Sequence, residues 1–234
     1  MNPEYYSTLE LKRSNLKRLA LLFANVFGAP PWNEVWRCPE CNRFYGPEDS
    51  KGTASPCCSI PLIVAYPENE TVDYISKELS QPLAKLESVS RKNGQLEAFA
   101  WGYQFKDVYV FAQKKWPQSE ELQAKVVAAI GKYTQPESPF YYLSEVGVSP
   151  PSRGNGIGLS LTSSLIGYGL EKGLPVIFRT NWASPMMRIA ARLDMIQIMG
   201  LRINVVNNQI IKTGEIAEFI DEINQDRTLF IKLP

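Results

Sequence analysis

The sequence predicts an α+β protein built on one main sheet. Strand-like and helix-like runs are mixed along the 234 residues rather than strictly alternating. Asn93-Gly94 separates two strand-like runs, which is a strong signal for a hairpin because both residues tolerate positive φ. A strand-like run over 140–148 leads through a glycine-rich loop into a helical run. The length fits one large domain or one domain with an insertion.

Each expected element follows from the spacing of its apolar residues. The run from Asn15 repeats apolar residues at helical spacing as far as Phe27, and Gly28 followed by two prolines ends it. Ser184 at the cap and Pro185 at the first position predict the start of another helix. The remaining expected helices are 70–79, 121–133, 159–173 and 214–224, and the expected strands are 7–13, two within 84–105, 140–148, 175–180 and 227–233.

Composition is that of an ordinary globular protein, with 44% hydrophobic and 21% charged residues. The net charge of +1 gives no support for a nucleic-acid partner. No apolar run approaches the roughly 20 residues that span a bilayer, and the first ten residues have neither a basic nor an apolar signal region. We therefore expect a cytoplasmic protein with no membrane partner.

The chain contains no histidine. This excludes Ser-His and Cys-His nucleophile pairs and every His-ligated metal site. Proton transfer must therefore use Glu, Asp, Tyr, Lys, Cys, the substrate or water.

The glycine-rich loop runs from Arg153 to Gly158 and has glycine at every second position. A nucleotide-hydrolysing P-loop needs a lysine after its last glycine, and this loop has Leu159 there. The dinucleotide fingerprint needs a different glycine spacing and an acidic residue about 20 positions later, and both are missing. A strand, a small-residue loop and a helix N-terminus can still hold an anion with backbone N–H groups, so a pyrophosphate fits best. A tight turn without a ligand is the alternative.

The segment "LSEVGVSPPSRGNGIGLSLTSSLI" (143–166) resembles the acyl-CoA-binding motif of the GNAT superfamily of N-acyltransferases. The resemblance continues in chain order over most of the sequence. Residues 16–36 resemble the first helix and the turn after it, 96–105 resemble the third strand, and 180–195 resemble the later Asn…Leu-Gly-Phe segment.

The resemblance implies a GNAT fold over residues 1–234, with a mixed, mostly antiparallel sheet flanked by helices. It also implies acetyl-CoA as cosubstrate. The loop would bind the pyrophosphate, the backbone of Val146 and Val148 would pair with the pantetheine arm like an added strand, and Asn181 would contact the pantetheine or acyl region. The implied loop residues are Arg153, Gly154, Asn155, Gly156, Ile157 and Gly158.

In this family the acceptor amine attacks the thioester directly, which needs no histidine. Glu145 is our candidate base, and a merely solvated or hydrogen-bonded strand glutamate is the alternative. The family's usual tyrosine, which protonates the leaving thiolate, falls at Ala190. Three options follow: another group supplies that proton, the thiolate leaves unassisted, or the protein binds acyl-CoA without fast catalysis. Acceptor-lining candidates are Tyr103, Tyr141 and Tyr142.

Two functions are therefore expected. The first is N-acetyltransfer to a primary amine on a small molecule or protein. The second is a catalytically weak acyl-CoA-binding or interaction protein on the same fold. A homodimer is compatible with both.

All four cysteines lie in residues 37–66, a segment rich in Pro, Gly and Ser without counterpart in the family core. Cys38 and Cys41 form half of a zinc knuckle, and Cys57 and Cys58 follow after fifteen residues. We predict a structural Zn²⁺ held by these four thiolates. Because adjacent cysteines chelate with strain, one of them could be replaced by Asp49 or Glu40. Without a metal, the four cysteines would be free thiols or would form disulfides.

Overall fold

The computed structural model describes the backbone and side chains of residues 12–117, 119–181, 183–199 and 227–234. It describes the backbone alone at 6–7, 201–206 and 209–215. The chain divides into two compact units, and each is described by itself. The first is Met1–Ser80, Leu86–Ala100 and Val146–Gly158, and the second is Gln81–Lys85, Trp101–Glu145 and Leu159–Pro234.

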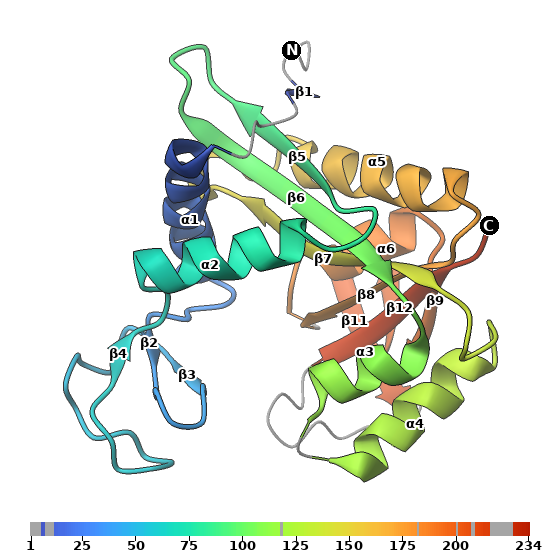
Figure 1. The fold of residues 1–234 in the computed structure, drawn as a ribbon, viewed down its shortest axis with the longest axis horizontal. Coiled ribbons are helices and arrows are strands. Elements are labelled where there is room, and N and C mark those ends of the chain that lie inside the picture. The colour runs from blue at the N-terminus through green and yellow to red at the C-terminus, as the bar shows by residue number, and fades with distance from the viewer. Residues whose placement is uncertain are drawn as a thin grey trace. The chain divides into compact units, whose positions relative to one another are not determined.

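A seven-stranded sheet is the centre of the fold (Figure 1). The described ladder between β7 and β8 is parallel, and β12 pairs antiparallel with both β8 and β9. The predicted mixed sheet flanked by helices is therefore confirmed. In spatial order the strands are β1 (Tyr6–Ser7), β5 (Lys85–Ser90), β6 (Leu96–Phe105), β7 (Phe140–Val148), β8 (Val176–Asn181), β12 (Arg227–Lys232) and β9 (Ile196–Met199).

The first unit contains α1 (Arg13–Phe27) and α2 (Glu68–Leu79), which pack against each other (Figure 1). The apolar stripe that predicted α1 is its buried face. Phe23 in that stripe stacks on Phe99 of β6, with ring centroids 5.8 Å apart. A small sheet, with β2 (Trp36–Arg37) between β3 (Phe44–Tyr45) and β4 (Ile63–Val64), connects the two helices.

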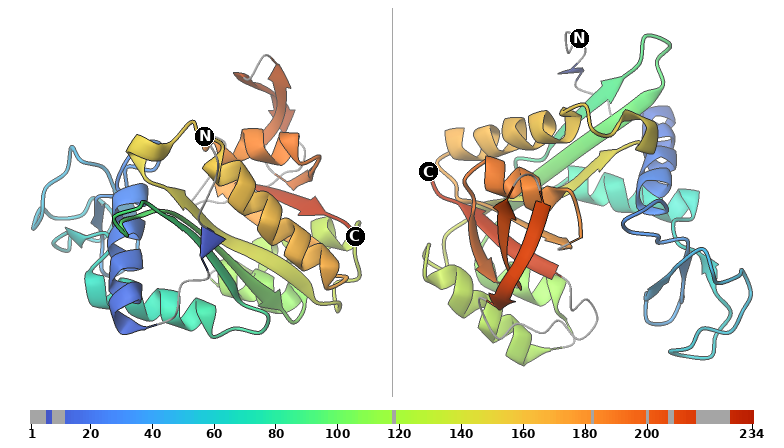
Figure 2. Two further views of the ribbon diagram at one scale, coloured as in Figure 1. Left: turned by 90° about the horizontal axis from the view of Figure 1, so that it is seen from above. Right: turned by 180° about the vertical axis from the view of Figure 1, so that it is seen from behind.

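The second unit has helices on both faces of its strands (Figure 2). A cluster of buried rings and aliphatic side chains on one face packs against two helices that contact each other, α3 (Val108–Lys115) and α4 (Glu120–Gly131). On the other face, Gly169 of α5 (Ile157–Glu171) lies so close to Tyr141 that a Cβ there would be 2.9 Å from the tyrosine Cβ. The unit also contains α6 (Met186–Arg192) and the hairpin of β10 (Leu201–Val206) and β11 (Gln209–Glu215).

Most predicted elements are confirmed to within two or three residues, but three predictions differ. The predicted hairpin at Asn93-Gly94 is confirmed between β5 and β6, and only the conformation of its turn differs. Positive φ occurs only at Gly94 (80°), so the turn is a three-residue loop closed by Arg91 N–H donating to the Gln95 carbonyl. The predicted helix 214–224 is wrong at 214–215, which belong to β11, and the rest lies outside the described residues.

The third difference is at the first predicted strand. Of residues 7–13, Ser7 ends β1 and Arg13 begins α1, while 8–11 lie outside the described residues. Several further elements were not predicted. They are α3, β9, the three two-residue strands β2, β3 and β4, and the strands β10 and β11. No helix among the described residues combines the length and apolarity needed to cross a bilayer.

Candidate functional site

The glycine-rich loop leaves β7 and enters α5 at Ile157, as predicted. Gly154 and Gly156 have φ of 84° and 77°, and a Cβ at either position would meet no atom within 4 Å. Glycine is therefore needed there for the backbone conformation rather than for space. The backbone N–H groups of 154–156 find no acceptor among the described residues. Successive unpaired N–H groups before a helix N-terminus form an anion-binding concavity.

No side chain closes this concavity from within the described loop. The first turn of α5 carries no acidic residue. The Asn155 side-chain amide donates to the Ser152 carbonyl at 3.3 Å, so it strengthens the loop instead of accepting from the helix N–H groups. The loop therefore keeps its donors for an external anion.

Arg153 has a different role from the one expected. Its guanidinium donates to three backbone carbonyls: Val148 at 3.1 Å, Val26 at 3.4 Å, and Pro30. Desolvation by partial burial lowers the pKa of Arg153 from its ordinary value. The Val26 carbonyl is in the last turn of α1, where the helix dipole favours a cation. In this structure Arg153 ties the loop to the end of α1.

Ser152 and Glu97 fix the start of the loop, and neither was predicted from the sequence. The buried Ser152 hydroxyl donates to the Glu97 carboxylate at 2.8 Å, and Ser149 N–H donates to the Glu97 carbonyl at 2.7 Å. Ion pairing with Arg91, then the Ser152 hydrogen bond, lowers the pKa of Glu97 despite desolvation. No sequence pattern links a strand glutamate to a loop serine 55 positions away.

The alternation of side chains between β6 and β7 is irregular. A Cβ at Gly102 would lie 2.6 Å from the Tyr141 ring, and one at Gly147 would lie 2.3 Å from the Phe99 ring. In regular strands 141 and 147 share a face, whereas 99 and 102 point to opposite faces. The alternation therefore shifts by one residue along β6 or β7, as at a β-bulge, a feature common beside functional sites.

On the edge that faces β8, the described pairing of β7 covers only part of the strand. Its described ladder with β8 consists of Tyr141 with Val176 and Tyr142 with Ile177. The strand continues to Val148, and no pair to β8 is found beyond Tyr142 in the described part of the chain. Val146 and Val148, both half-buried, lie beyond the described ladder with β8. Backbone groups in this part of β7 can pair with an extended ligand.

Glu145 and Asn181 lie near the ends of β7 and β8. Glu145 is half-buried. The Asn181 side-chain oxygen accepts from Ala183 N–H at 2.7 Å, which leaves its NH₂ group as the donor. The predicted helix start is shifted by one residue, because Pro185 and not Ser184 is at the N-cap of α6. The Ser184 hydroxyl still accepts from the N–H of Met186, the first residue of α6, at 3.2 Å. Trp182 lies outside the described residues.

The end of α6 is closed by a residue in the left-handed conformation. Asp194, which stands where the family pattern has glycine, has φ of 49°. Met195 N–H donates to the Ala190 carbonyl at 3.0 Å, as in a helix end with a left-handed residue. Ala190 is fully buried. This position therefore supplies no proton donor. Of the candidate tyrosines, Tyr103, Tyr141 and Tyr142 are all buried too.

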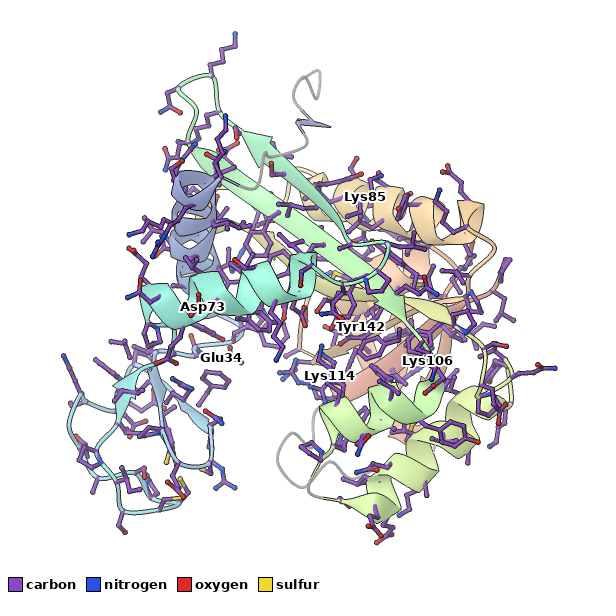
Figure 3. All side chains as sticks on the ribbon, in the orientation of Figure 1. Glu34, Asp73, Lys85, Lys106, Lys114 and Tyr142 are labelled. Carbon is purple, nitrogen blue, oxygen red and sulfur yellow. The ribbon has the colours of Figure 1, made fainter. Side chains whose placement is uncertain are left out.

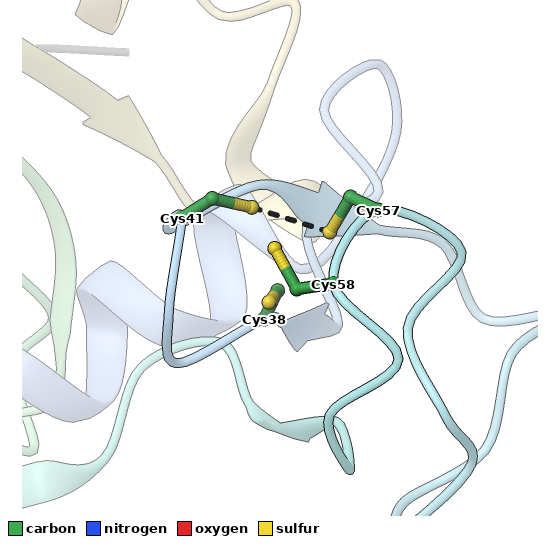
Figure 4. A group of neighbouring side chains, drawn as sticks. All are labelled: Cys38, Cys41, Cys57 and Cys58. Carbon is green, nitrogen blue, oxygen red and sulfur yellow. Dashed lines mark hydrogen bonds between the residues drawn. The ribbon is translucent and has the colours of Figure 1, made fainter.

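The four cysteines form one cluster (Figure 4). All four Sγ atoms lie within 4.8 Å of one another, and none is in a disulfide. A tetrahedral Zn²⁺ with Zn–S distances of about 2.3 Å needs sulfurs about 3.8 Å apart, so this set fits that ion. The adjacent pair contributes both sulfurs, and neither Asp49 nor Glu40 belongs to the cluster.

Two turns present these sulfurs. Cys38 and Cys41 lie in the turn between β2 and β3, where Asn42 has φ of 58° and its N–H donates to the Cys38 carbonyl. Cys57 and Cys58 lie in a second turn, closed by Ser59 N–H donating to the Ser55 carbonyl at 2.8 Å. Each turn thus directs two sulfurs inward.

Hydrogen bonds favour a thiolate in this cluster. The Tyr45 hydroxyl donates to Cys57 Sγ at 3.0 Å and lowers the pKa of Cys57 to about 6. The Ser55 hydroxyl lies 3.4 Å from Cys38 Sγ and lowers the pKa of Cys38. Cys58 shows the opposite shift: its contact with Cys57 raises its pKa to about 12. Two of the four cysteines thus have a lowered pKa, and a bound cation would favour deprotonation of the others.

Comparison with known proteins identifies the fold of this chain. No family model and no curated protein sequence matches the chain. Among solved structures, arylalkylamine N-acetyltransferase 2 of Aedes aegypti is similar with a TM-score of 0.54 and 11% identity, covering 98% of each chain. Polyamine N-acetyltransferase of Drosophila melanogaster has a TM-score of 0.52 and 12% identity, covering 98% of this chain and 99% of its own.

A third similar structure is described as a GNAT superfamily phosphinothricin acetyltransferase from Sinorhizobium meliloti in complex with AcCoA. Its TM-score is 0.51 at 12% identity, covering 99% of this chain and 89% of its own. These identities are low, so the likeness concerns the fold. The sheet order, the strand–loop–helix unit and the end-to-end structural likeness together show that this chain has the GNAT acetyltransferase fold.

Proposed function

We propose that this protein is an acetyl-CoA-dependent N-acetyltransferase that acetylates a primary amine. The observation that carries the proposal is the loop between β7 and α5, whose N–H groups at 154–156 have no acceptor among the described residues. Backbone donors at a helix N-terminus suit the coenzyme pyrophosphate. The structure from Sinorhizobium meliloti on the same fold is in complex with AcCoA.

The pantetheine arm would extend the β7 edge. The backbone of Val146 and Val148 would hydrogen-bond to its amides, as an added strand does. The Asn181 NH₂ group would donate to the arm or to the acyl carbonyl. The complete proposed set for the coenzyme is Val146, Val148, Arg153, Gly154, Asn155, Gly156, Ile157, Gly158 and Asn181, in which Arg153 acts through the loop conformation.

The chemistry would be direct transfer. The neutral amine nitrogen attacks the thioester carbonyl, a backbone N–H of β7 stabilises the oxyanion, and the C–S bond breaks to release thiolate. Glu145, half-buried beside Val146, would accept the amine proton directly or through water. The thiolate then takes a proton from solvent or the released amine proton, because Ala190 supplies none.

The test measures binding and turnover separately. Calorimetry with acetyl-CoA should give micromolar binding, and amines should cause thiol release that follows acetylamine formation one to one. Glu145→Gln should lower kcat at least about 100-fold and leave the acetyl-CoA Kd nearly unchanged. No acetyl-CoA binding would contradict the proposal. Binding without turnover on any amine would support the acyl-CoA-binding alternative.

We also propose that residues 37–66 form an inserted module held by a structural Zn²⁺ on Cys38, Cys41, Cys57 and Cys58. The support is the close approach of all four sulfurs from two turns. Four thiolates leave no open coordination position, so the ion would stabilise the module and take no part in the transfer.

Metal analysis of purified protein should give one zinc per chain. Cys38→Ser/Cys41→Ser should lose the zinc and should make residues 37–66 sensitive to protease, while acetyl-CoA binding persists. Ser59→Ala, which changes the second cysteine turn without removing a ligand, should retain the metal. A zinc-free wild-type chain with a protease-resistant module would refute the assignment.

A further inference from the structure

Three side chains place polar and positive groups on one face of the second unit. In the antiparallel ladder of β8 and β12, Leu229 is opposite Arg179 and Arg227 is opposite Asn181. Opposed residues point to the same face, and Leu229 belongs to the buried cluster that faces α3 and α4. Arg179, Asn181 and Arg227 therefore continue this face beyond the apolar cluster. Both arginines are only half-buried.

Two lysines of α3 join them. Lys114 Nζ donates to the Tyr103 hydroxyl at 3.0 Å and lies 5.0 Å from that ring. Lys115 Nζ lies 4.6 Å from the Tyr142 ring. Figure 3 shows Lys114 extending from α3 toward the strands and Tyr142 close to it in that view. These contacts hold flexible ammonium groups in fixed positions.

The supporting rings form one continuous cluster. Tyr103 and Tyr142 have centroids 6.0 Å apart, Phe111 lies 5.2 Å from Tyr142, and Trp116 lies 5.8 Å from Phe111. Arg179 stacks on Trp116 with its Cζ 5.1 Å from the ring centroid. The cations on these rings thus belong to one surface. We call Lys114, Lys115, Arg179 and Arg227 the cationic face.

The cationic face lies near the proposed transfer chemistry along the strands. Arg179 precedes Asn181 by two residues on β8, and Tyr142, whose ring contacts Lys115, precedes Glu145 by three residues on β7. Two residues of strand span about 7 Å. The span between Arg179 and Asn181 is comparable to the length of a small ω-amino acid, which carries its amine at one end and its acid at the other.

The geometry points to an acceptor amine that also carries an anionic group, such as a carboxylate, bound by the cationic face; this inference rests on the proposed acetyl transfer. Arginine and lysine bind carboxylates through charge-assisted hydrogen bonds. The acid thus orients the acceptor, and the neutral amine reaches the thioester.

The experiment compares acceptors that differ only by the acid. γ-Aminobutyrate is paired with propylamine, and lysine with cadaverine, at saturating acetyl-CoA with thiol release as readout. The acid-bearing member should have the higher kcat/KM. Lys115→Gln and Arg179→Gln should raise its KM about tenfold or more and change the decarboxylated partner less than about twofold.

Lys172→Gln is the matched control. Lys172 also stacks on a tyrosine of the second unit, 5.4 Å from the Tyr168 ring, but Tyr168 packs on Tyr141, which faces α5. Lys172→Gln should change the KM of neither acceptor.

Calorimetry of each acceptor with the coenzyme A complex gives a readout independent of turnover. Weaker binding of the acid in Lys115→Gln and Arg179→Gln would support the cationic face even if catalysis is slow. A preference for decarboxylated amines, or equal effects of the variants on both members of a pair, would overturn it while leaving acetyl transfer intact. Failure to bind acetyl-CoA would instead refute the proposed function itself.

Discussion

Substitution of Arg153 by methionine distinguishes two roles for this side chain: it could hold the loop to the end of α1, or it could bind the coenzyme pyrophosphate. Methionine keeps the length and much of the apolar contact but removes all five donors. In the structure the donors serve three carbonyls, of Val148, Val26 and Pro30. The loop anion would instead be held by backbone N–H groups. The substitution should therefore affect stability more than coenzyme binding.

The magnitude follows from the contacts. Three hydrogen bonds from a partly exposed cation, one of them 3.4 Å long, are together worth about 2 kcal/mol. The favourable contact with the C-terminal end of α1 is included in that figure, since Val26 is one of the three acceptors. For a chain of this length, about 2 kcal/mol corresponds to a fall in Tm of roughly 4–8 °C.

The assay is thermal unfolding of the wild type and Arg153→Met, together with acetyl-CoA titration well below both Tm values. We expect the lower Tm and a rise in Kd of less than about tenfold. Arg91→Met is the control, because Arg91 forms an ion pair with its side chain 48% exposed, and such pairs contribute under about 1 kcal/mol. A Kd raised about 100-fold with an unchanged Tm would refute the reasoning and would assign Arg153 to the pyrophosphate.

Further outcomes follow from single positions. Gly167→Ala should stabilise α5 by about 0.5–1 kcal/mol, because a Cβ there meets nothing within 4 Å. Gly169→Ala, two residues later, should lower the free energy of unfolding by about 1–3 kcal/mol, because its Cβ would lie 2.7 Å from a Val176 methyl. Urea unfolding measures both variants, and a change of the same sign in both free energies of unfolding would contradict the placement of α5 on the sheet. Asp194→Gly should raise the free energy of unfolding by up to about 1 kcal/mol, since the left-handed conformation costs glycine nothing, and an unchanged urea midpoint would count against that φ. The folded-state pKa of Glu97 is lowered, so the carboxylate stabilises the fold at pH values above its ordinary pKa of 4.5, and this stabilisation is lost as the pH falls below 4.5. Glu97→Gln should therefore make the free energy of unfolding less dependent on pH in that acid range. A pH dependence identical to that of the wild type would be evidence against the ion pair.

Local signals determined the elements that have strong periods or turn residues. The stripe of α1, the long β7 and the glycines of the loop were all recognised because their conformations depend on neighbours in the sequence. The elements that were missed or misassigned lack such signals. α3 has eight residues and a weak apolar period, and Gly214-Glu215 belong to β11 because β10 pairs with them, not because of their own propensity.

The candidate site likewise divides into features that the sequence predicted and features that only the structure shows. The loop was predicted from its glycine spacing, and the cysteine cluster from its knuckle half, although the sequence left open whether adjacent cysteines could both point inward. The structure brings all four sulfurs together because two separate turns meet.

The sequence alone determined the α+β class, the strand–loop–helix unit, the absence of histidine chemistry and the four sulfurs as a candidate metal set, since all of these reside in residue identity and short spacing. Tertiary structure decided what Arg153 contacts, which glutamate holds Ser152, and which cations share a face with Tyr142. These depend on strand register and on helices packed across a sheet, so they join residues up to 127 positions apart. No local pattern carries that information.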